Sequence, residues 1–261
     1  MGKVIAITNQ KGGVGKTTTA INLSAGMAYL GKKVLLIDLD PQGNASQGAG
    51  ASNKESYNSS YDVLLSDTSI SEAAIKLKAP PISIIPSSIE LAGADLEMAE
   101  FKNGRELFLK DKIAVVKKDY DFIIIDCPPS LGLLNTNALT AADSVMIPVQ
   151  CEYYALEGLT QLLSTIRLVQ RLFNPHLKIE GVLLTMFDIR TRLSVEVQQE
   201  VRKYFKEKVY KSYIPRNIKL SEAPSRGQSI FEYAIKSEGA RSYAALATEV
   251  IKENEGKYNE Q

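Results

Sequence analysis

Residues 9–19 read NQKGGVGKTTT, a stretch whose residue types suit it to bind a polyphosphate. Glycines at three positions let consecutive backbone N–H groups turn inward on phosphate oxygens, and a helix that starts after them adds the positive end of its dipole. Lys16 is placed to reach the β- and γ-phosphates of a nucleotide, and the hydroxyl of Thr17 is placed to hold Mg²⁺. The predicted nucleotide contacts are Lys11, Gly12, Gly13, Val14, Gly15, Lys16, Thr17 and Thr18.

The loop departs from the common pattern G-x-x-x-x-G-K-[ST] at its first position. Gln10 stands where the pattern has a glycine, and an additional lysine, Lys11, follows it. Phosphoryl transfer develops negative charge that needs a cation beyond Mg²⁺ and Lys16, and no arginine lies close to the loop in sequence. Lys11 is the spare cation, and its side chain could point toward a nucleotide bound by a facing copy of the chain.

Carboxylates stand at the ends of two apolar runs. The stretch DLDPQG brings Asp38 and Asp40 to the end of one run, where they can orient a water molecule and the shell of a metal ion. The alternative is that they cap a turn. The stretch IIIDCPPS places Asp126 at the end of another run, in the manner of a carboxylate that binds Mg²⁺ through water. We assign Lys11, Lys16 and Asp40 to catalysis and Thr17, Asp38 and Asp126 to the metal.

The elements that must position these residues are short apolar runs rich in β-branched residues, alternating with segments of helical period. Near-continuous apolar strands of this kind are typical of a parallel sheet covered on both faces. We therefore predict an α/β fold with a doubly wound, mostly parallel sheet and helices on both faces. The predicted strands are Val4–Thr8, Val34–Asp38, Ile82–Pro86, Phe122–Asp126, Ser144–Val149 and Ile179–Thr185. The predicted helices are Lys16–Leu30, Arg105–Lys117, Ala155–Phe173, Val195–Lys206 and Gly239–Asn254.

Domain organisation and composition are those of an ordinary globular chain. Hydrophobic residues make up 44% of the sequence and charged residues 23%. We expect one domain over residues 1–254, with a loop at residues 40–60 and a polar C-terminal tail at residues 255–261. No apolar run approaches the roughly 18 residues of a membrane span, and the N-terminus enters a strand at once. These features predict a cytoplasmic protein without a membrane partner.

Several stretches together resemble one family. KGGVGKT, DLDPQG, IIIDCPPSLG, QCEYYALEG and IPRNIKLSEAPS are similar to motifs of the ParA/Soj chromosome-partitioning ATPases, which are P-loop ATPases of the deviant Walker A class. The resemblance implies ATP and Mg²⁺ as cofactors, with Lys11 crossing a sandwich homodimer to the partner's nucleotide and Asp40 positioning the attacking water. It also implies that Pro215 and Asn217 lie against the adenine.

The same resemblance implies that the ATP-bound dimer binds double-stranded DNA without sequence preference, on the nucleoid. A ParB-type centromere-binding protein would then stimulate hydrolysis. Residues 185–241 contain 12 Lys or Arg against 7 Asp or Glu, in a chain whose formal net charge is +1, so a polyanion would meet this segment. For each basic residue the alternative is a solvated charged surface. The candidate DNA contacts are Arg190, Arg192, Arg216 and Lys219.

A MinD-like membrane-cycling ATPase that positions cell division is the alternative function with the same fold. Such a protein needs a C-terminal amphipathic helix with Lys or Arg on one side and Phe or Leu on the other. The end of this chain, VIKENEGKYNEQ, is acidic and almost free of large apolar residues. The sequence therefore favours the partitioning ATPase.

Overall fold

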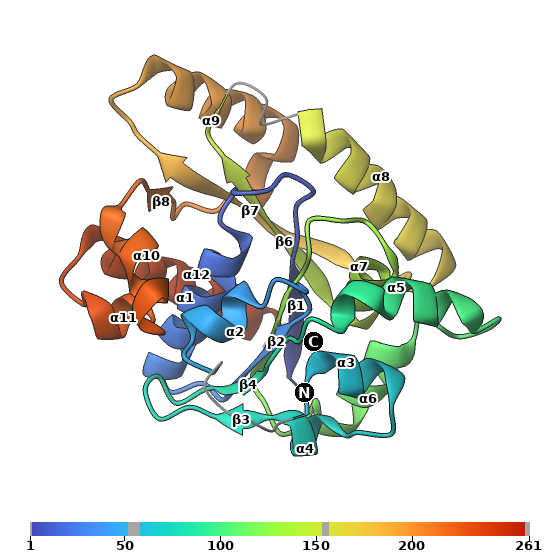
Figure 1. Cartoon of the computed structure of the whole chain (residues 1–261). Helices are drawn as coiled ribbons and strands as arrows, with labels where there is room; N and C mark the ends of the chain where they lie inside the picture. The colour runs from blue at the N-terminus through green and yellow to red at the C-terminus, as the bar shows by residue number, and fades with distance from the viewer. Residues whose placement is uncertain (1, 52–57, 153–156, 259–261) are drawn as a thin grey trace.

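A sheet of eight strands forms the centre of the molecule in the computed structural model, which describes residues 2–51, 58–152 and 157–258 (Figure 1). The strand order is β3-β4-β2-β5-β1-β6-β7-β8, and the strand pairs are parallel except for β3 with β4. This is the mostly parallel, doubly wound sheet that the apolar runs predict. The strands are β1 (Lys3–Ile7), β2 (Val34–Asp38), β3 (Ile75–Lys76), β4 (Ser83–Ile85), β5 (Phe122–Asp126), β6 (Ser144–Gln150), β7 (Lys178–Phe187) and β8 (Ile214–Pro215).

Helices cover both faces of the sheet. On one face they are α1 (Lys16–Tyr29), α2 (Asn44–Gly48), α10 (Ile218–Glu222), α11 (Ile230–Tyr233) and α12 (Glu238–Tyr258). On the other face they are α3 (Ser60–Leu65), α4 (Ile70–Ala73), α5 (Leu91–Glu100), α6 (Phe108–Val116), α7 (Leu133–Ala141), α8 (Glu157–Leu172) and α9 (Arg192–Phe205). None of the described helices is both long and apolar enough to cross a membrane.

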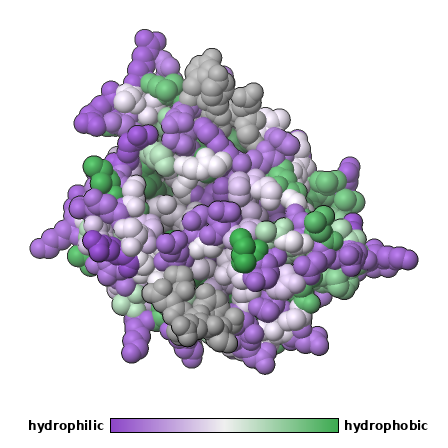
Figure 2. All heavy atoms as spheres, in the orientation of Figure 1, coloured by the Kyte–Doolittle hydropathy of each residue, from purple (hydrophilic) through white to green (hydrophobic). Residues whose placement is uncertain are grey.

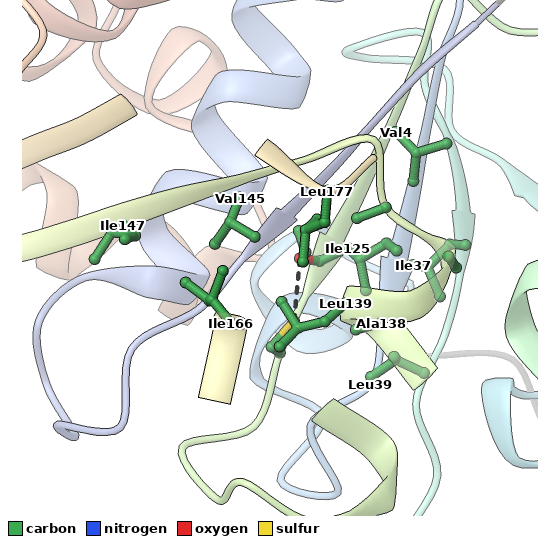
Figure 3. Close-up of a cluster of buried hydrophobic side chains, with 14 of the residues drawn as sticks. Val4, Ile37, Leu39, Ile125, Ala138, Leu139, Val145, Ile147, Ile166 and Leu177 are labelled. Atoms are coloured by element: carbon green, nitrogen blue, oxygen red, sulfur yellow. Dashed lines mark hydrogen bonds between the residues drawn. The ribbon is translucent and has the colours of Figure 1, made fainter. Parts of the chain in front are cut away.

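The central strands are buried from both sides, which explains why their sequences are continuously apolar. Along β1, Val4 and Ala6 belong to the core under α6 and α7, whereas Ile5 and Ile7 belong to the core under α1 and α12. Figure 3 shows strand residues of the first core facing Leu139 of α7 and Ile166 of α8. Burial of both faces at about 25 cal/mol per Å² of apolar surface holds the two helical layers on the sheet. The carboxyl ends of the parallel strands therefore form one rigid edge.

The structure corrects the prediction that residues 40–60 form a loop. They contain α2, and Ser60 begins α3. The Gly, Asn and Ser composition that suggested a loop is overridden by tertiary hydrogen bonds, because the N–H and hydroxyl of Ser46 both donate to the Asp38 carboxylate. The two-residue strands β3 and β8 are too short to leave a sequence pattern.

Helix boundaries differ from the predicted ones by a few residues. Helix α9 begins at Arg192, because the side chain of Thr191 caps it by accepting the N–H of Ser194. Helix α12 continues to Tyr258, beyond the predicted end at Asn254. The predicted start of the helix at Ala155 lies outside the described residues.

Candidate nucleotide-binding site

A cavity of about 920 Å³ lies where several parallel strands end. One end is lined by the glycine-rich loop, Lys16, Thr17 and Asp40. The other end of the cavity is lined by residues of the segment from Ile214 to Ser225. This segment contains β8, α10 and the first residues after α10. This is the crevice in which open α/β sheets bind ligands.

The glycine-rich loop has a backbone that only glycine adopts easily. Gly13 and Gly15 have φ of 74° and 87°, in the left-handed region where a side chain would be strained. Gly15 is also the N-cap of α1 and supplies no capping side chain, and the first turn of α1 has no acidic residue. The first N–H groups of α1 and its positive dipole end therefore remain available for an anion.

Lys16 projects from the start of α1 into the cavity. The residue is only 7% exposed, and its Nζ donates to the carbonyl oxygen of Lys11 at 3.3 Å. Burial lowers the pKa of Lys16, whereas the carboxylates of Asp126 and Asp40 act in the opposite direction. A buried ammonium held beside a glycine-rich loop is suited to a phosphate group.

Asp126, at the end of β5, is fully buried, and neither carboxylate oxygen accepts a hydrogen bond of full geometry from the described residues, although the Thr17 hydroxyl lies near it. Burial and the charge of Asp38 raise its pKa well above the usual range, and the Thr17 hydroxyl partly offsets this rise. Both oxygens would be satisfied by a hydrated cation. These residues fit a hydrated Mg²⁺, which the Thr17 hydroxyl and the Asp126 carboxylate would hold.

A magnesium ion here would take most of its shell from outside the chain. The described residues contain no group of three or more His, Cys, Asp and Glu that could hold a metal by itself. Mg²⁺ usually keeps several waters and is completed by substrate phosphates. The arrangement therefore suits a magnesium–nucleotide complex better than a permanently bound metal.

Asp38 and Asp40 are close in sequence but lie in different surroundings. Asp38 is fully buried and accepts hydrogen bonds from the Asp40 N–H at 3.2 Å and from the Ser46 N–H and hydroxyl at 2.8 and 2.7 Å. Burial raises the pKa of Asp38 to about 6. Asp38 does not line the cavity, so its observed contacts are those of the turn-capping alternative, and its metal role stays a prediction.

Asp40 lines the cavity and is held by its neighbours. Its Oδ1 accepts the N–H of Gln42 at 3.0 Å, and its backbone carbonyl accepts the Ser87 hydroxyl at 2.6 Å. Ser46 in turn accepts the N–H of Ser87 at 2.8 Å. Sequence reasoning missed both serines, because a serine far along the chain carries no signal of this contact.

Lys11 is directed away from the cavity. Its Nζ lies 3.4 Å from Oε2 of Glu152, just beyond β6, and the two side chains are 35% and 47% exposed. The other carboxylate oxygen of Glu152 accepts a hydrogen bond from Gln150. Lys11 does not line the cavity, whereas Lys16 does. The two lysines of the loop thus face different directions, and a role of Lys11 toward a facing copy stays a prediction.

The far end of the cavity holds the two residues expected against the adenine. Pro215 in β8 and Asn217 both line it, and Asn217 caps α10 by accepting the N–H of Lys219 at 2.9 Å. Tyr243 of α12 also lines the cavity, and its hydroxyl lies 3.1 Å from that of Thr19. Tyr243 was not predicted, since it comes from a helix whose pattern indicates only an apolar face.

The candidate DNA-binding residues are exposed, and three of them are paired with nearby carboxylates. Arg190 donates two hydrogen bonds to Asp188, at 2.9 and 2.7 Å. Arg192 contacts Glu196 at 2.7 Å, and Lys219 contacts Glu222 at 2.8 Å. Arg216 lines the cavity. On the face that Figure 2 shows, hydrophilic side chains predominate and hydrophobic ones form only small groups.

A doubly wound, mostly parallel sheet defines a P-loop nucleoside triphosphatase when a glycine-rich loop follows its first strand, a buried lysine begins the next helix and a buried aspartate ends β5. Residues 2–179 match a family model described as an AAA domain. The sporulation initiation inhibitor protein Soj of Bacillus subtilis is 57% identical over 250 residues, which cover 96% of this chain and 98% of Soj. The chromosome partitioning protein ParA of Myxococcus xanthus is 51% identical over 252 residues, covering 97% of this chain and 89% of ParA.

The chain therefore belongs to the AAA domain family and, within it, to the ParA/Soj chromosome-partitioning ATPases. A solved structure with the same fold is cobyrinic acid a,c-diamide synthase from Mycobacterium smegmatis with bound ADP and magnesium. It has a TM-score of 0.85 and 38% identity, and the match covers 98% of this chain and 96% of that one. The protein is an ATPase, with ATP and Mg²⁺ as its cofactors.

Proposed function

We propose that this ATPase segregates chromosomes or plasmids as an ATP-dependent sandwich dimer that binds DNA without sequence preference. A ParB-type centromere-binding protein stimulates its hydrolysis. The observation that carries the proposal is the division between the two lysines of the loop. Lys16 is buried in the cavity, and Lys11 faces out of it toward Glu152. A cation at the mouth of the loop is suited to a nucleotide on a facing copy.

Within one chain, the residues divide the work on ATP. The N–H groups of the glycine-rich loop and the Lys16 ammonium hold the β- and γ-phosphates. The hydroxyl of Thr17 and the carboxylate of Asp126 would hold Mg²⁺. Bound Mg²⁺ neutralises charge that develops on the phosphates. Asp40 keeps one carboxylate oxygen on the Gln42 N–H, which leaves the other to orient the attacking water.

Lys11 completes the site of the facing copy. The two side chains of its ion pair with Glu152 are 35% and 47% exposed, and pairs of this kind contribute at most about 1 kcal/mol. A triphosphate carries several negative charges and is the stronger partner for an ammonium. Exchange of Glu152 for a phosphate across the dimer therefore costs little, and it links dimer formation to bound ATP.

DNA binding follows from the dimer. Three of the four candidate basic residues are paired with carboxylates of the same chain, so one copy offers few uncompensated charges. Two copies related by a two-fold axis double the number of phosphate contacts on one face. We place the protein in the cytoplasm on the nucleoid, as one ATPase domain with a polar C-terminal tail.

Light scattering with ATP, with ADP and without nucleotide tests this proposal, each with and without duplex DNA. The mass should double with ATP alone, and DNA should join only the doubled species. Equal DNA binding with ADP, or a monomer that persists at saturating ATP, would contradict it.

A further inference from the structure

A β-bulge interrupts β7 where the strand reaches the cavity. Thr185 is paired with Ile214 of β8, and Phe187 is paired with the next residue, Pro215, so Met186 is an extra residue without a partner on β8. Met186 has φ of 50°, in the left-handed region that a long unbranched side chain rarely enters. A bulge of this kind redirects side chains next to a site.

The extra residue changes the faces on which the side chains lie. Up to the bulge, β7 alternates, with Val182 and Leu184 in one core and Leu183 in the other. Strict alternation would send Phe187 to the side of Leu183, but Phe187 lies in the core with Val182 and Leu184. The bulge therefore keeps Phe187 in the core and leaves Met186 on the wall of the cavity.

Thr185 joins the bulge to the phosphate end of the cavity. It is 2% exposed, and its hydroxyl donates to the carbonyl oxygen of Val14 in the glycine-rich loop at 2.9 Å. A Cβ on Gly15 would lie 3.7 Å from its methyl carbon. Met186, the residue after Thr185, lines the cavity, and the pairing of β7 with β8 places Pro215 near it. Asn217, two residues after Pro215, lines the cavity as well. A single segment thus links both ends of the cavity.

We propose that the Thr185–Met186 bulge sets how the base and the phosphates are held together. Met186 packs its thioether against the face of the purine, and Thr185 is a positioning residue that holds the glycine-rich loop at the matching distance. The assignment rests on the proposed adenine end formed by Pro215 and Asn217. A thioether is polarisable and makes favourable contacts with aromatic rings. The left-handed backbone at Met186 is retained because it aims this side chain into the cavity.

The test for Met186 compares two ligands that share phosphates but differ in the base. Magnesium-ATP and magnesium with inorganic triphosphate are titrated by calorimetry into wild type, Met186→Gly, Met186→Asn and Met186→Leu. Glycine and asparagine accept the left-handed backbone and remove the thioether. We therefore expect ATP affinity to fall about tenfold in both variants. Their triphosphate affinity should stay within about twofold of wild type, and their melting temperature should not be lowered. Leucine keeps the apolar bulk and keeps ATP affinity within about threefold.

Two results would overturn the assignment of Met186. One is ATP affinity equal to that of wild type in both the glycine and the asparagine variants. The other is an equal loss of ATP and triphosphate affinity, which would mean that the bulge acts only on the loop. If wild type itself binds the two ligands equally, the proposed adenine end fails, and the inference fails with it, whatever the variants show.

Thr185 gives the opposite pattern. Thr185→Val keeps the shape but removes the hydrogen bond to Val14, so the affinities for ATP and triphosphate fall by the same factor, about fivefold. Thr185→Ser restores the hydroxyl and recovers both affinities to within about twofold of wild type. Unchanged affinities in the valine variant, or no recovery in the serine variant, would remove the positioning role.

Discussion

Charged side chains are arranged in opposite ways around the cavity and in the exposed segment that follows β7. Beside the cavity, behind Lys16 and Thr17, the Asp126 carboxyl is fully buried and accepts no well-formed hydrogen bond from the described residues. In the segment after β7, the Arg190 side chain is 85% exposed and forms a two-point pair with Asp188. Burying an unpaired charge is costly, whereas exposed ion pairs contribute little. A buried ionisable group without a matched partner therefore marks the place where a charged ligand completes the molecule, and substitutions around that place have the largest effects.

The largest effect is expected at Lys16. Lys16→Ala removes the buried cation from a phosphate site otherwise built of backbone dipoles, and ATP affinity should fall at least about a hundredfold. Filter binding with labelled ATP measures it, and Lys33→Ala, on an exposed lysine just before β2, is the matched control. Near-normal affinity for ATP in Lys16→Ala would break the comparison between buried and exposed charge.

Asp40 is expected to separate binding from hydrolysis. Asp40→Ala leaves the glycine-rich loop and Lys16 in place, so ATP affinity stays within a few-fold, but it removes the group that orients water, and turnover falls at least about a hundredfold. Phosphate release under saturating ATP measures the loss. Asp62→Ala, in the capping box of α3, is a control for general destabilisation. Turnover within about threefold of wild type would reduce Asp40 to a turn residue.

Asp126 sharpens the comparison through pH. Burial raises its pKa well above the ordinary value, so the folded state keeps this proton to a higher pH than the unfolded state does. The stability of the nucleotide-free protein must therefore fall as the pH rises above the ordinary carboxyl range, and Asp126→Asn removes this loss. The melting temperature of Asp126→Asn should exceed that of wild type by about 3 °C or more at pH 8 and by little near pH 4.

Calorimetric melting without nucleotide or Mg²⁺ checks this expectation. The control is Asp111→Asn, which changes an exposed carboxylate of α6. An increase of the same size at both pH values would show that Asp126 is not an uncompensated acid in the free protein.

Lys11 lies between the two extremes, because it is partly exposed and its partner Glu152 is replaceable. Lys11→Ala should bind ATP within about threefold of wild type, yet its ATP-dependent dimer should be at least tenfold weaker, about the effect of losing one charge-assisted contact. Sedimentation velocity at several concentrations measures the dimer. Glu152→Gln releases Lys11 without removing it and should still dimerise with ATP. Normal dimerisation of Lys11→Ala would place this lysine in its own site.

The phosphate end of the cavity could be predicted from the sequence because its parts are contiguous. Each part stands in a short stretch whose residue types and spacing are typical of a phosphate site. These parts are the glycine-rich loop, Lys16, Asp40 just after β2 and Asp126 at the end of β5. The central strands were equally clear, since strands buried on both faces must be apolar throughout.

The remaining parts of the site depend on contacts between distant segments. Ser87, Thr185 and Tyr243 are common residue types, and only the fold brings them to the cavity. The bulge at Met186 leaves no pattern, because one extra residue in a strand does not alter its apolar composition. Pro215 and Asn217 were named only through the family resemblance. Base recognition is thus less visible in this sequence than phosphate recognition.

The smallest effect is expected for DNA affinity, at the exposed Arg190 after β7. Its carboxylate partner must be displaced before a DNA phosphate can bind, and Arg190 lowers the pKa of Asp188 to about 2, so this competitor stays ionised at any pH at which the protein would be assayed. Arg190→Glu should weaken DNA binding in ATP about fivefold and reduce the salt dependence by about one unit of log–log slope per contact. Asp188→Asn frees the guanidinium and should tighten binding.

A DNA affinity that falls in Arg190→Glu and rises in Asp188→Asn cannot be explained by a surface that is only solvated. Gel-shift titrations of two unrelated duplexes, at several salt concentrations and with ATP or ADP, measure both. Lys102→Glu makes the same charge change on an exposed lysine outside residues 185–241 and should leave DNA affinity within about twofold of wild type. If Lys102→Glu weakens binding as much as Arg190→Glu, net charge alone governs the interaction, and the basic segment is no specific DNA-binding face. If Arg190→Glu and Asp188→Asn both match wild type, Arg190 only caps the end of β7, and the DNA contacts must be sought at Arg216 and Lys219, beside the cavity.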